Sequence, residues 1–195
     1  MTLASGRAHD CPLQTVTLPS ASLRLADLGY FKVKVFEQLN AQGVWWVSRL
    51  PARAGIWTGE QVDHIASWLA NQDGTCIDQP IELTAQRFYC RLIAIPVPPE
   101  VAQMRRQRVR NSAMARKNSQ LKPETLALCD WTLLVTNLPV EDFTAHDILC
   151  LQRLRWQIEL LFDLWKTDLS MDQWRSQQPH QILSEIYAKL LLALI

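Results

Sequence analysis

Four polar side chains in the last third of the chain have the spacing of one helix face. At about 100° per residue, Gln152, Glu159 and Lys166 lie at about +60°, +40° and +20° from Arg155. The sequence predicts a helix that begins after an N-cap at Thr144 and runs to about Lys166. Carboxylates ligate hard cations such as Mg²⁺, and Arg and Lys pair with anions, so this stripe could line a site. The simpler alternative is a solvated face with an Arg155–Glu159 ion pair.

A second set of side chains on this helix is apolar and lies outside the polar stripe. Its members are Leu154, Trp156, Ile158 and Leu161. A helix with a polar stripe beside an apolar one typically packs against a core and also lines a site. We therefore expect these four side chains to bury the helix.

The elements that precede this helix predict a mixed α/β protein. Residues 22–27 alternate apolar and polar side chains, which is typical of a strand that ends at Asp27. Residues 32–42 have the pattern of a helix, and residues 44–50 are rich in strand-forming side chains. A strand, a helix and a strand within about 30 residues have the size of a parallel crossover unit.

The middle of the chain predicts further short elements. They are a helix at 60–71, a turn at 72–74, paired strands at 77–84 and 87–97, an arginine-rich helix at 101–117, and a strand at 131–136. Strands and helices thus alternate along most of the chain.

Composition limits the function without naming a partner. Lys and Arg number 20 against 19 Asp and Glu, so nucleic-acid binding would require local clustering of charge. The five cysteines are odd in number and form no CxxC pair, so we expect no disulfide framework or zinc site and a reducing compartment. No run of about 18 uncharged apolar residues and no signal peptide is present, which predicts a cytoplasmic protein without a membrane span.

The polar stripe resembles a known catalytic signature. Arg155-x3-Glu159-x6-Lys166 is similar to the Tyr-x2-Arg-x3-Glu-x6-Lys pattern of DDE transposases of the bacterial insertion-sequence-four family. The resemblance implies that Glu159 is the third metal-binding carboxylate and that Arg155 and Lys166 hold DNA phosphates. Two positions depart from the family: Gln152 replaces the Tyr, and Asp163 stands where relatives usually have Lys. Asp163 places a negative charge one helical turn from Glu159, where it would repel DNA or compete for metal.

An earlier segment resembles the same family. Residues 27–31, followed by residues 43–49, are similar to the segment where the family places its second catalytic Asp at the tip of a strand. The resemblance implies that Asp27 is the second metal-binding carboxylate and that Arg49 contacts DNA. Without the resemblance, Asp27 is a turn residue after a strand and Arg49 is a solvated charge at a strand end.

A tryptophan and a basic helix are further candidates for DNA binding. Trp131 stands 28 residues before Glu159, as does a tryptophan that some relatives stack on a base flipped out of a DNA hairpin. Such stacking contributes roughly 1–3 kcal/mol per base. The alternative is a strand tryptophan packed in the core. The arginines of 101–117 could add contacts to the DNA backbone, and a solvated surface helix is the alternative there.

The resemblance implies a ribonuclease-H-like α/β core with a strand-containing insertion before the catalytic helix. Residues 1–50 would form part of the catalytic core without its first strands, 51–128 the insertion subdomain, and 129–195 the return strand and catalytic helix. The first catalytic Asp is expected upstream of residue 1, and Asp10 is assigned no role. Because the first Asp is expected upstream and the apolar run 186–195 stops without a cap, we expect a chain truncated at both ends.

The implied parent activity is DNA transposition. A homodimer would use two Mg²⁺ ions, with Mn²⁺ as an alternative, to cleave and join strands of double-stranded DNA at transposon ends and in target DNA. It would act in the bacterial cytoplasm, associated with the nucleoid when bound to DNA. Because one carboxylate is missing, we expect this chain alone to be inactive. Two alternatives stay open: a non-catalytic DNA-binding or dimerisation fragment that interferes with intact transposase, and a non-functional pseudogene product.

Overall fold

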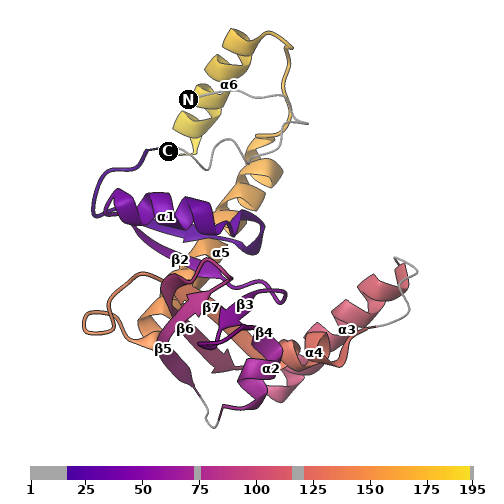
Figure 1. The fold of residues 1–195 in the computed structure, drawn as a ribbon. Coiled ribbons are helices and arrows are strands. Elements are labelled where there is room, and N and C mark those ends of the chain that lie inside the picture. Colours follow the sequence, from indigo (N-terminus) through magenta and orange to yellow (C-terminus); the bar gives the residue numbers. More distant parts are fainter. Residues whose placement is uncertain (1–16, 73–75, 116–120, 194–195) are drawn as a thin grey trace.

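The fold is built on one mixed sheet, seen in a computed structural model that describes residues 17–72, 76–115 and 121–193 (Figure 1). Its strands are β1 (Leu23–Ala26), β2 (Trp45–Arg49), β3 (Gly55–Trp57), β4 (Val62–His64), β5 (Ile77–Leu83), β6 (Phe88–Pro96) and β7 (Trp131–Thr136). They are ordered β1-β2-β7-β6-β5-β3-β4. The β1–β2 pair is parallel, and the other neighbouring strands are antiparallel.

The described helices lie on both faces of the sheet and beyond it. They are α1 (Val33–Ala41), α2 (Ile65–Ala70), α3 (Pro99–Ala115), α4 (Pro123–Ala127), α5 (Ala145–Leu169) and α6 (Pro179–Leu192), with short 3-10 helices η2 (Leu28–Tyr30) and η3 (Leu128–Asp130). Figure 1 shows α3 and the second half of α5 projecting from the sheet, with α6 beyond the end of α5. Asp10 lies outside the described residues.

The predicted parallel crossover unit is confirmed in β1, α1 and β2. Ala26 of β1 pairs with Ser48 of β2, so the two strands end at the same edge of the sheet. Phe36 of α1 stacks on Trp46 of β2 with ring centroids 4.2 Å apart, which fixes the helix on one face of the sheet. The crossover therefore places Asp27, the residue after β1, at this edge.

The two faces of the sheet are buried by different helices. On one face, α1 and α2 complete a cluster with alternate strand residues, including Trp46, Leu92, Leu133 and Val135. On the other face, Ile148 of α5 packs with Val47, Ile93 and Leu134. Since side chains alternate along a strand, the face of any strand residue near the site follows from these two clusters.

The middle of the chain departs from the prediction in three places. The helix predicted at 60–71 is instead β4 followed by α2, because Val62 pairs with Trp57 in a short hairpin. Neither β3 nor α4 was predicted, since elements of three to five residues show no clear periodicity. The predicted turn at 72–74 and the end of the predicted helix 101–117 lie partly outside the described residues.

The segment assigned to an insertion, 51–128, continues the sheet of the flanking segments. β6 pairs with β7 from Arg91 and Thr136 to Pro96 and Trp131. The larger buried cluster contains side chains from this segment and from α1, β2 and β7. The division into core and insertion subdomains stays a prediction.

Helix α5 begins at the predicted cap. The backbone N–H of Thr144 donates to Oδ2 of Asp147 at 2.9 Å, and the N–H of Asp147 donates back to Oγ1 of Thr144 at 3.2 Å. The hydroxyl and backbone of Thr144 lower the pKa of the Asp147 carboxyl by hydrogen bonding. This capping box satisfies N–H groups that the first helical turn leaves free, so it fixes where α5 starts.

The prediction that four apolar side chains bury α5 is wrong for the described part of the chain. Leu154, Trp156, Ile158 and Leu161 are between 42% and 58% exposed. The first half of the helix instead packs against the sheet, through Ile148 and the partly buried Leu149 and Leu151. Helical periodicity separates the faces of a helix but does not show which half of its length meets the sheet.

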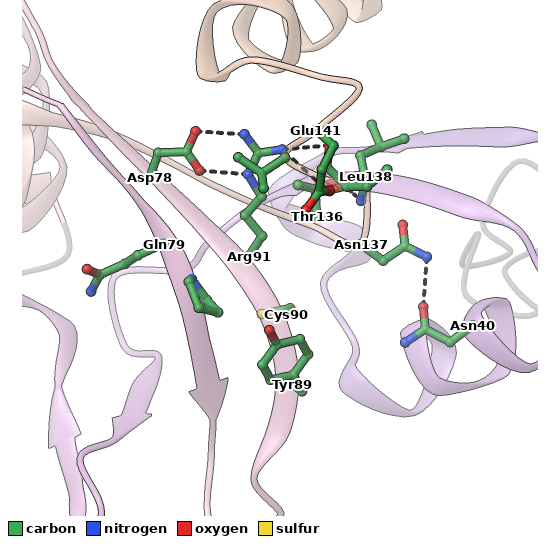
Figure 2. A pocket seen from close by; sticks show the side chains of 13 residues that line it. Asn40, Asp78, Gln79, Tyr89, Cys90, Arg91, Thr136, Asn137, Leu138 and Glu141 are labelled. Carbon is green, nitrogen blue, oxygen red and sulfur yellow. Dashed lines mark hydrogen bonds and ion pairs between the residues drawn. The ribbon is translucent and has the colours of Figure 1, made fainter.

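An ion pair between a buried arginine and a partly exposed aspartate joins the two longest strands to the loop after β7 (Figure 2). Nε and Nη2 of Arg91 each donate to a carboxylate oxygen of Asp78 at 2.6 Å. Nη1 donates to the backbone oxygens of Leu138 and Pro139, both at 3.3 Å. These residues line a hollow of about 370 Å³ at the end of the sheet away from Asp27. Arg91 is satisfied by the protein itself, which favours a structural role.

Removing the carboxylate of this pair should destabilise the fold. We expect Asp78→Ala to lower the free energy of unfolding by about 3 kcal/mol, because it leaves a buried guanidinium without its counter-charge. The matched control is Glu82→Ala on the same strand, whose partner Arg87 is 58% exposed. The control should lose less than about 1 kcal/mol. Urea unfolding followed by circular dichroism measures both, and equal losses would contradict the structural role of Arg91.

Candidate active site

Strand alternation sends Asp27 and Arg49 toward the face of the sheet that α5 covers. Leu25 and Val47 pair across β1 and β2, and both belong to the cluster that packs with α5. Asp27 and Arg49 follow two residues later on their strands, and the backbone of Asp27 is still extended (φ −83°, ψ 171°). Both side chains therefore lie on the α5 side of the same sheet edge.

Arg155 of α5 joins the two predicted carboxylates. Its Nη2 lies 3.6 Å from Oδ1 of Asp27, and its Nη1 donates to Oε1 of Glu159. Asp27 and Glu159 are separated by 132 positions (159 − 27), yet they share one guanidinium group. Because that group is a rigid plane, the two contacted oxygens lie within roughly 10 Å of each other. The ion pair between Arg155 and Glu159 that helical spacing predicts is present. Asp27 also contacts Arg155, so the three side chains form one charged group.

The surroundings of Arg155 hold its guanidinium in place. Its side chain is 13% exposed, compared with 39% for Asp27 and 44% for Glu159. The guanidinium carbon also lies 5.8 Å from the ring centroid of Trp156, within the range of a cation–π contact. The positive charge is thus more buried than either negative charge, and the two carboxylates compensate it.

The two carboxylates do not by themselves form a metal site. They offer hard oxygen donors, which Mg²⁺ prefers. Among the described residues, however, no three or more His, Cys, Asp or Glu side chains gather closely enough to hold a metal ion. The guanidinium of Arg155 already lies between Asp27 and Glu159. The described residues therefore do not fit a divalent metal as they stand, and no metal-dependent step follows from them alone.

A buried amide lies one turn before Arg155. Gln152 is 6% exposed, and neither its Nε2 nor its Oε1 has a hydrogen-bond partner in the described part of the chain. Nε of Arg155 is likewise buried without a partner. Leaving a buried polar group without a partner costs about 1–3 kcal/mol. The position that departs from the signature Tyr is therefore a point of weakness in the packing of α5.

Lys166 is not brought to the Asp27 corner. It follows Glu159 by two helical turns, about 10 Å along the axis, on the part of α5 that projects from the sheet. Its Nζ lies 3.8 Å from Oδ1 of Asp163, and both side chains are exposed. The negative charge of Asp163 is therefore partly offset by the positive charge of Lys166.

Trp131 lies on the opposite face of the sheet from α5. It points to the same face as Leu133 and Val135, which belong to the cluster on the α1 and α2 side, and its ring packs against that cluster. Its backbone oxygen accepts a hydrogen bond from Nη1 of Arg105 at 2.8 Å. This packing supports the alternative of a core tryptophan, and the base-stacking role stays a prediction.

Sequence reasoning did not single out Arg105 as a site residue. Its Nη2 donates to Oγ1 of Thr132 at 3.2 Å, which holds the guanidinium against β7. Burial, and then the positive charge of Arg49, lower the pKa of Arg105. The one signal in the sequence was the density of arginine in the predicted helix at 101–117, which does not distinguish Arg105 from its neighbours.

Comparison with known proteins identifies the family of the chain. A family model described as "Transposase DDE domain" matches residues 1–195. The chain belongs to the DDE transposase family. It is 38% identical over 108 residues to the putative transposase InsL for insertion sequence element IS186A of Escherichia coli (strain K12), which covers 55% of this chain and 29% of that protein. It is 26% identical over 199 residues to the transposase for insertion sequence element IS231C of Bacillus thuringiensis subsp. berliner, which covers 92% of this chain and 41% of that protein.

The match bears on fold and chemistry at the level of the family. The matched regions span less than half the length of these relatives. DDE transposases are metal-dependent phosphoryl-transfer enzymes that act on DNA. The mixed sheet with helices on both faces agrees with the predicted ribonuclease-H-like core. In the described part of the chain, no helix is both long and apolar enough to span a bilayer.

The unpaired amide of Gln152 gives a test of the packing beside Arg155. Gln152→Leu should raise the free energy of unfolding by about 1 kcal/mol, because it removes a buried polar group without a partner and keeps its volume. The matched control Gln157→Leu changes an exposed glutamine on the same helix and should shift stability by less than about 0.5 kcal/mol. Thermal and urea unfolding measure both variants. A destabilised Gln152→Leu would mean that the amide is hydrogen-bonded in solution.

Proposed function

We propose that this chain contributes Asp27 and Glu159 as the second and third carboxylates of a DDE site that cleaves and joins DNA strands at transposon ends. The supporting observation is the shared contact with Arg155, which brings the two carboxylates to one corner of the sheet. A third carboxylate, which the described residues do not supply, completes the site in this proposal. The cofactor of the completed site is a pair of Mg²⁺ ions, with Mn²⁺ as the alternative.

The basic residues near this corner have the role of holding DNA. Arg49 lies at the end of β2 on the α5 side of the sheet, and Arg155 lies between the carboxylates. Lys166 projects further along α5, where it reaches DNA that extends beyond the sheet. Trp131 is the proposed stacking residue for an extruded base, although its ring packs on the other face. The partner is double-stranded DNA of transposon ends and target, bound by a homodimer in the bacterial cytoplasm.

The chain alone is proposed to bind DNA without cutting it. The absence of a third metal-ligating side chain at the corner, among the described residues, favours this reading. A DNA-binding or dimerisation fragment of this kind would interfere with an intact transposase by occupying transposon ends. This second candidate function needs Arg49, Arg155 and Lys166 but not the carboxylates.

The affinity for Mn²⁺ tests whether Asp27 and Glu159 share a cation, and it needs no enzyme activity. Arg155→Ala removes the guanidinium from between the two carboxylates, so Mn²⁺ should bind this variant several-fold more tightly than the unchanged chain. Adding Asp27→Asn to the variant should abolish the gain. Electron paramagnetic resonance of free Mn²⁺ measures the affinities.

The matched control for this measurement is Arg153→Ala, which removes an exposed arginine two residues earlier on α5. It changes the net charge equally and should leave Mn²⁺ affinity unaltered. The same gain in both arginine variants, or a gain that survives Asp27→Asn, would contradict a shared site at Asp27 and Glu159.

DNA binding without cleavage is the second measurement. The chain should bind duplex DNA with an affinity that falls as salt rises, and should leave DNA that carries the element's ends uncut in Mg²⁺ or Mn²⁺. Glu159→Gln should strengthen binding in the absence of metal, because it removes a negative charge and the partner of Arg155.

The control for charge alone is Glu141→Gln, an exposed carboxylate in the loop before α5, at the far end of the sheet. It should alter DNA affinity less than Glu159→Gln does. Gel electrophoresis of the DNA and fluorescence anisotropy supply the two readouts. Metal-dependent nicking that Glu159→Gln abolishes would overturn the proposal that the chain alone does not cut.

A further inference from the structure

Two arginines meet beside the carboxylate corner without acidic partners in the described part of the chain. Arg49 is the last residue of β2, next to the strand whose tip carries Asp27. Arg105 reaches back from α3, and its Nη1 and Nη2 donate to the backbone oxygen of Trp131 at 2.8 Å and to Oγ1 of Thr132 at 3.2 Å. These contacts hold the guanidinium of Arg105 on β7, the strand that follows β2 in the sheet.

The register of the sheet places Arg49, and the Thr132 hydroxyl that Arg105 contacts, on the face that α5 covers. Arg49 pairs with Leu134, and Thr132 lies two residues earlier on β7, so the three side chains point to the same face. Diagonal neighbours of this kind have Cα atoms about 7–8 Å apart, within reach of long side chains. The charge of Arg49 is close enough to lower the pKa of Arg105.

Two neighbouring positive charges favour an anion between them. A guanidinium group has five N–H donors, and the contacts with β7 use two donors of Arg105. The next residue on α3 differs, since Arg106 is ion-paired with Asp130. Arg105 differs from Arg106 in having no acidic partner among the described residues, and it lies close enough to Arg49 to feel its charge. A phosphate would accept hydrogen bonds from both groups and offset their repulsion.

We propose that Arg49 and Arg105 together bind one phosphate of a DNA backbone that crosses the Asp27 corner, and that Arg108 binds a neighbouring phosphate. The inference rests on the proposed function and adds α3 to the DNA-binding surface. Thr132 lies two strands from Asp27 and two residues beyond the level of Arg49, about 12 Å away. That separation corresponds to about three to four nucleotides at 3.4 Å of rise per nucleotide.

Positions around the axis of α3 predict which of its arginines face the DNA. Arg105 and Arg108 lie on one side of the helix, and Arg110 lies on another. At about 100° per residue, Arg108 lies about 60° from Arg105 around the helix axis, whereas Arg110 lies about 140° away. Arg108 and Arg110 are both exposed. The alternative, a helix that merely faces solvent, predicts equal effects for arginines at either position.

The test compares salt-dependent binding of one duplex DNA by the full chain and three single variants. Arg105→Met keeps much of the apolar stem, and Arg108→Ala removes an exposed charge. Each should weaken binding several-fold, and each should reduce the slope of log affinity against log salt by about 1, as expected for one lost phosphate contact. The matched control Arg110→Ala removes the same charge from the other side of α3 and should leave the slope unchanged. Fluorescence anisotropy at four or more salt concentrations measures the slopes.

The outcomes separate this inference from the proposed function. A chain that fails to bind DNA at all overturns both. A chain that binds DNA, with Arg105→Met and Arg110→Ala giving the same slope, overturns the inference and leaves the proposed function standing. Thermal unfolding monitors the fold of Arg105→Met. If that variant unfolds, the comparison of Arg108→Ala with Arg110→Ala decides the question, because both residues are exposed and equal slopes for the two overturn the inference.

Discussion

The corner that carries the candidate site depends on the charge of one arginine. Two carboxylates held near each other in a partly water-excluded place repel more strongly than they would in bulk water. The guanidinium of Arg155 contacts both Asp27 and Glu159, so it replaces that repulsion with attraction. The same contacts join the tip of an edge strand to a helix from the other end of the chain. The geometry of the corner and the packing of α5 therefore have a common origin.

The order of elements explains how such distant residues reach one corner. The parallel crossover of β1 and β2 puts Asp27 and Arg49 at the same sheet edge. β7 then pairs antiparallel with the other side of β2 and leads, through the capping box at Thr144, into α5. The residues between β2 and β7 extend the sheet on the far side of β7, so their length does not disturb this arrangement.

Much of this could be predicted from the sequence because it is encoded locally. Alternation in residues 22–27, the cap at Thr144 and the helical spacing of Arg155 and Glu159 each predicted what the structure contains. Linear spacing says nothing, however, about which face of a sheet a residue meets. Trp131 was chosen by its distance from Glu159 along the chain, and that distance could not show that its ring lies on the face opposite α5.

Contacts that depend on tertiary folding could not be predicted. Arg105 belongs to an arginine-rich helix, and it differs from its neighbours because α3 begins directly after β6 and turns this one side chain onto β7. The burial of Gln152 likewise depends on where α5 crosses the sheet. In both cases the residue type is ordinary, and the neighbouring strand gives it its significance.

The path of α5 shows why Arg155 matters more than its single contacts suggest. The sheet supports the helix through Ile148, Leu149 and Leu151, and α6 meets it again near its end, where Lys189 donates to the backbone oxygen of Ser170 at 2.7 Å. Glu159 lies between these supports, on a stretch whose apolar side chains are exposed in the described part of the chain. A helix segment with few buried contacts opens more easily than one that packs on a core. The bridge from Arg155 to Asp27 is therefore a contact that ties the stretch around Glu159 to the sheet.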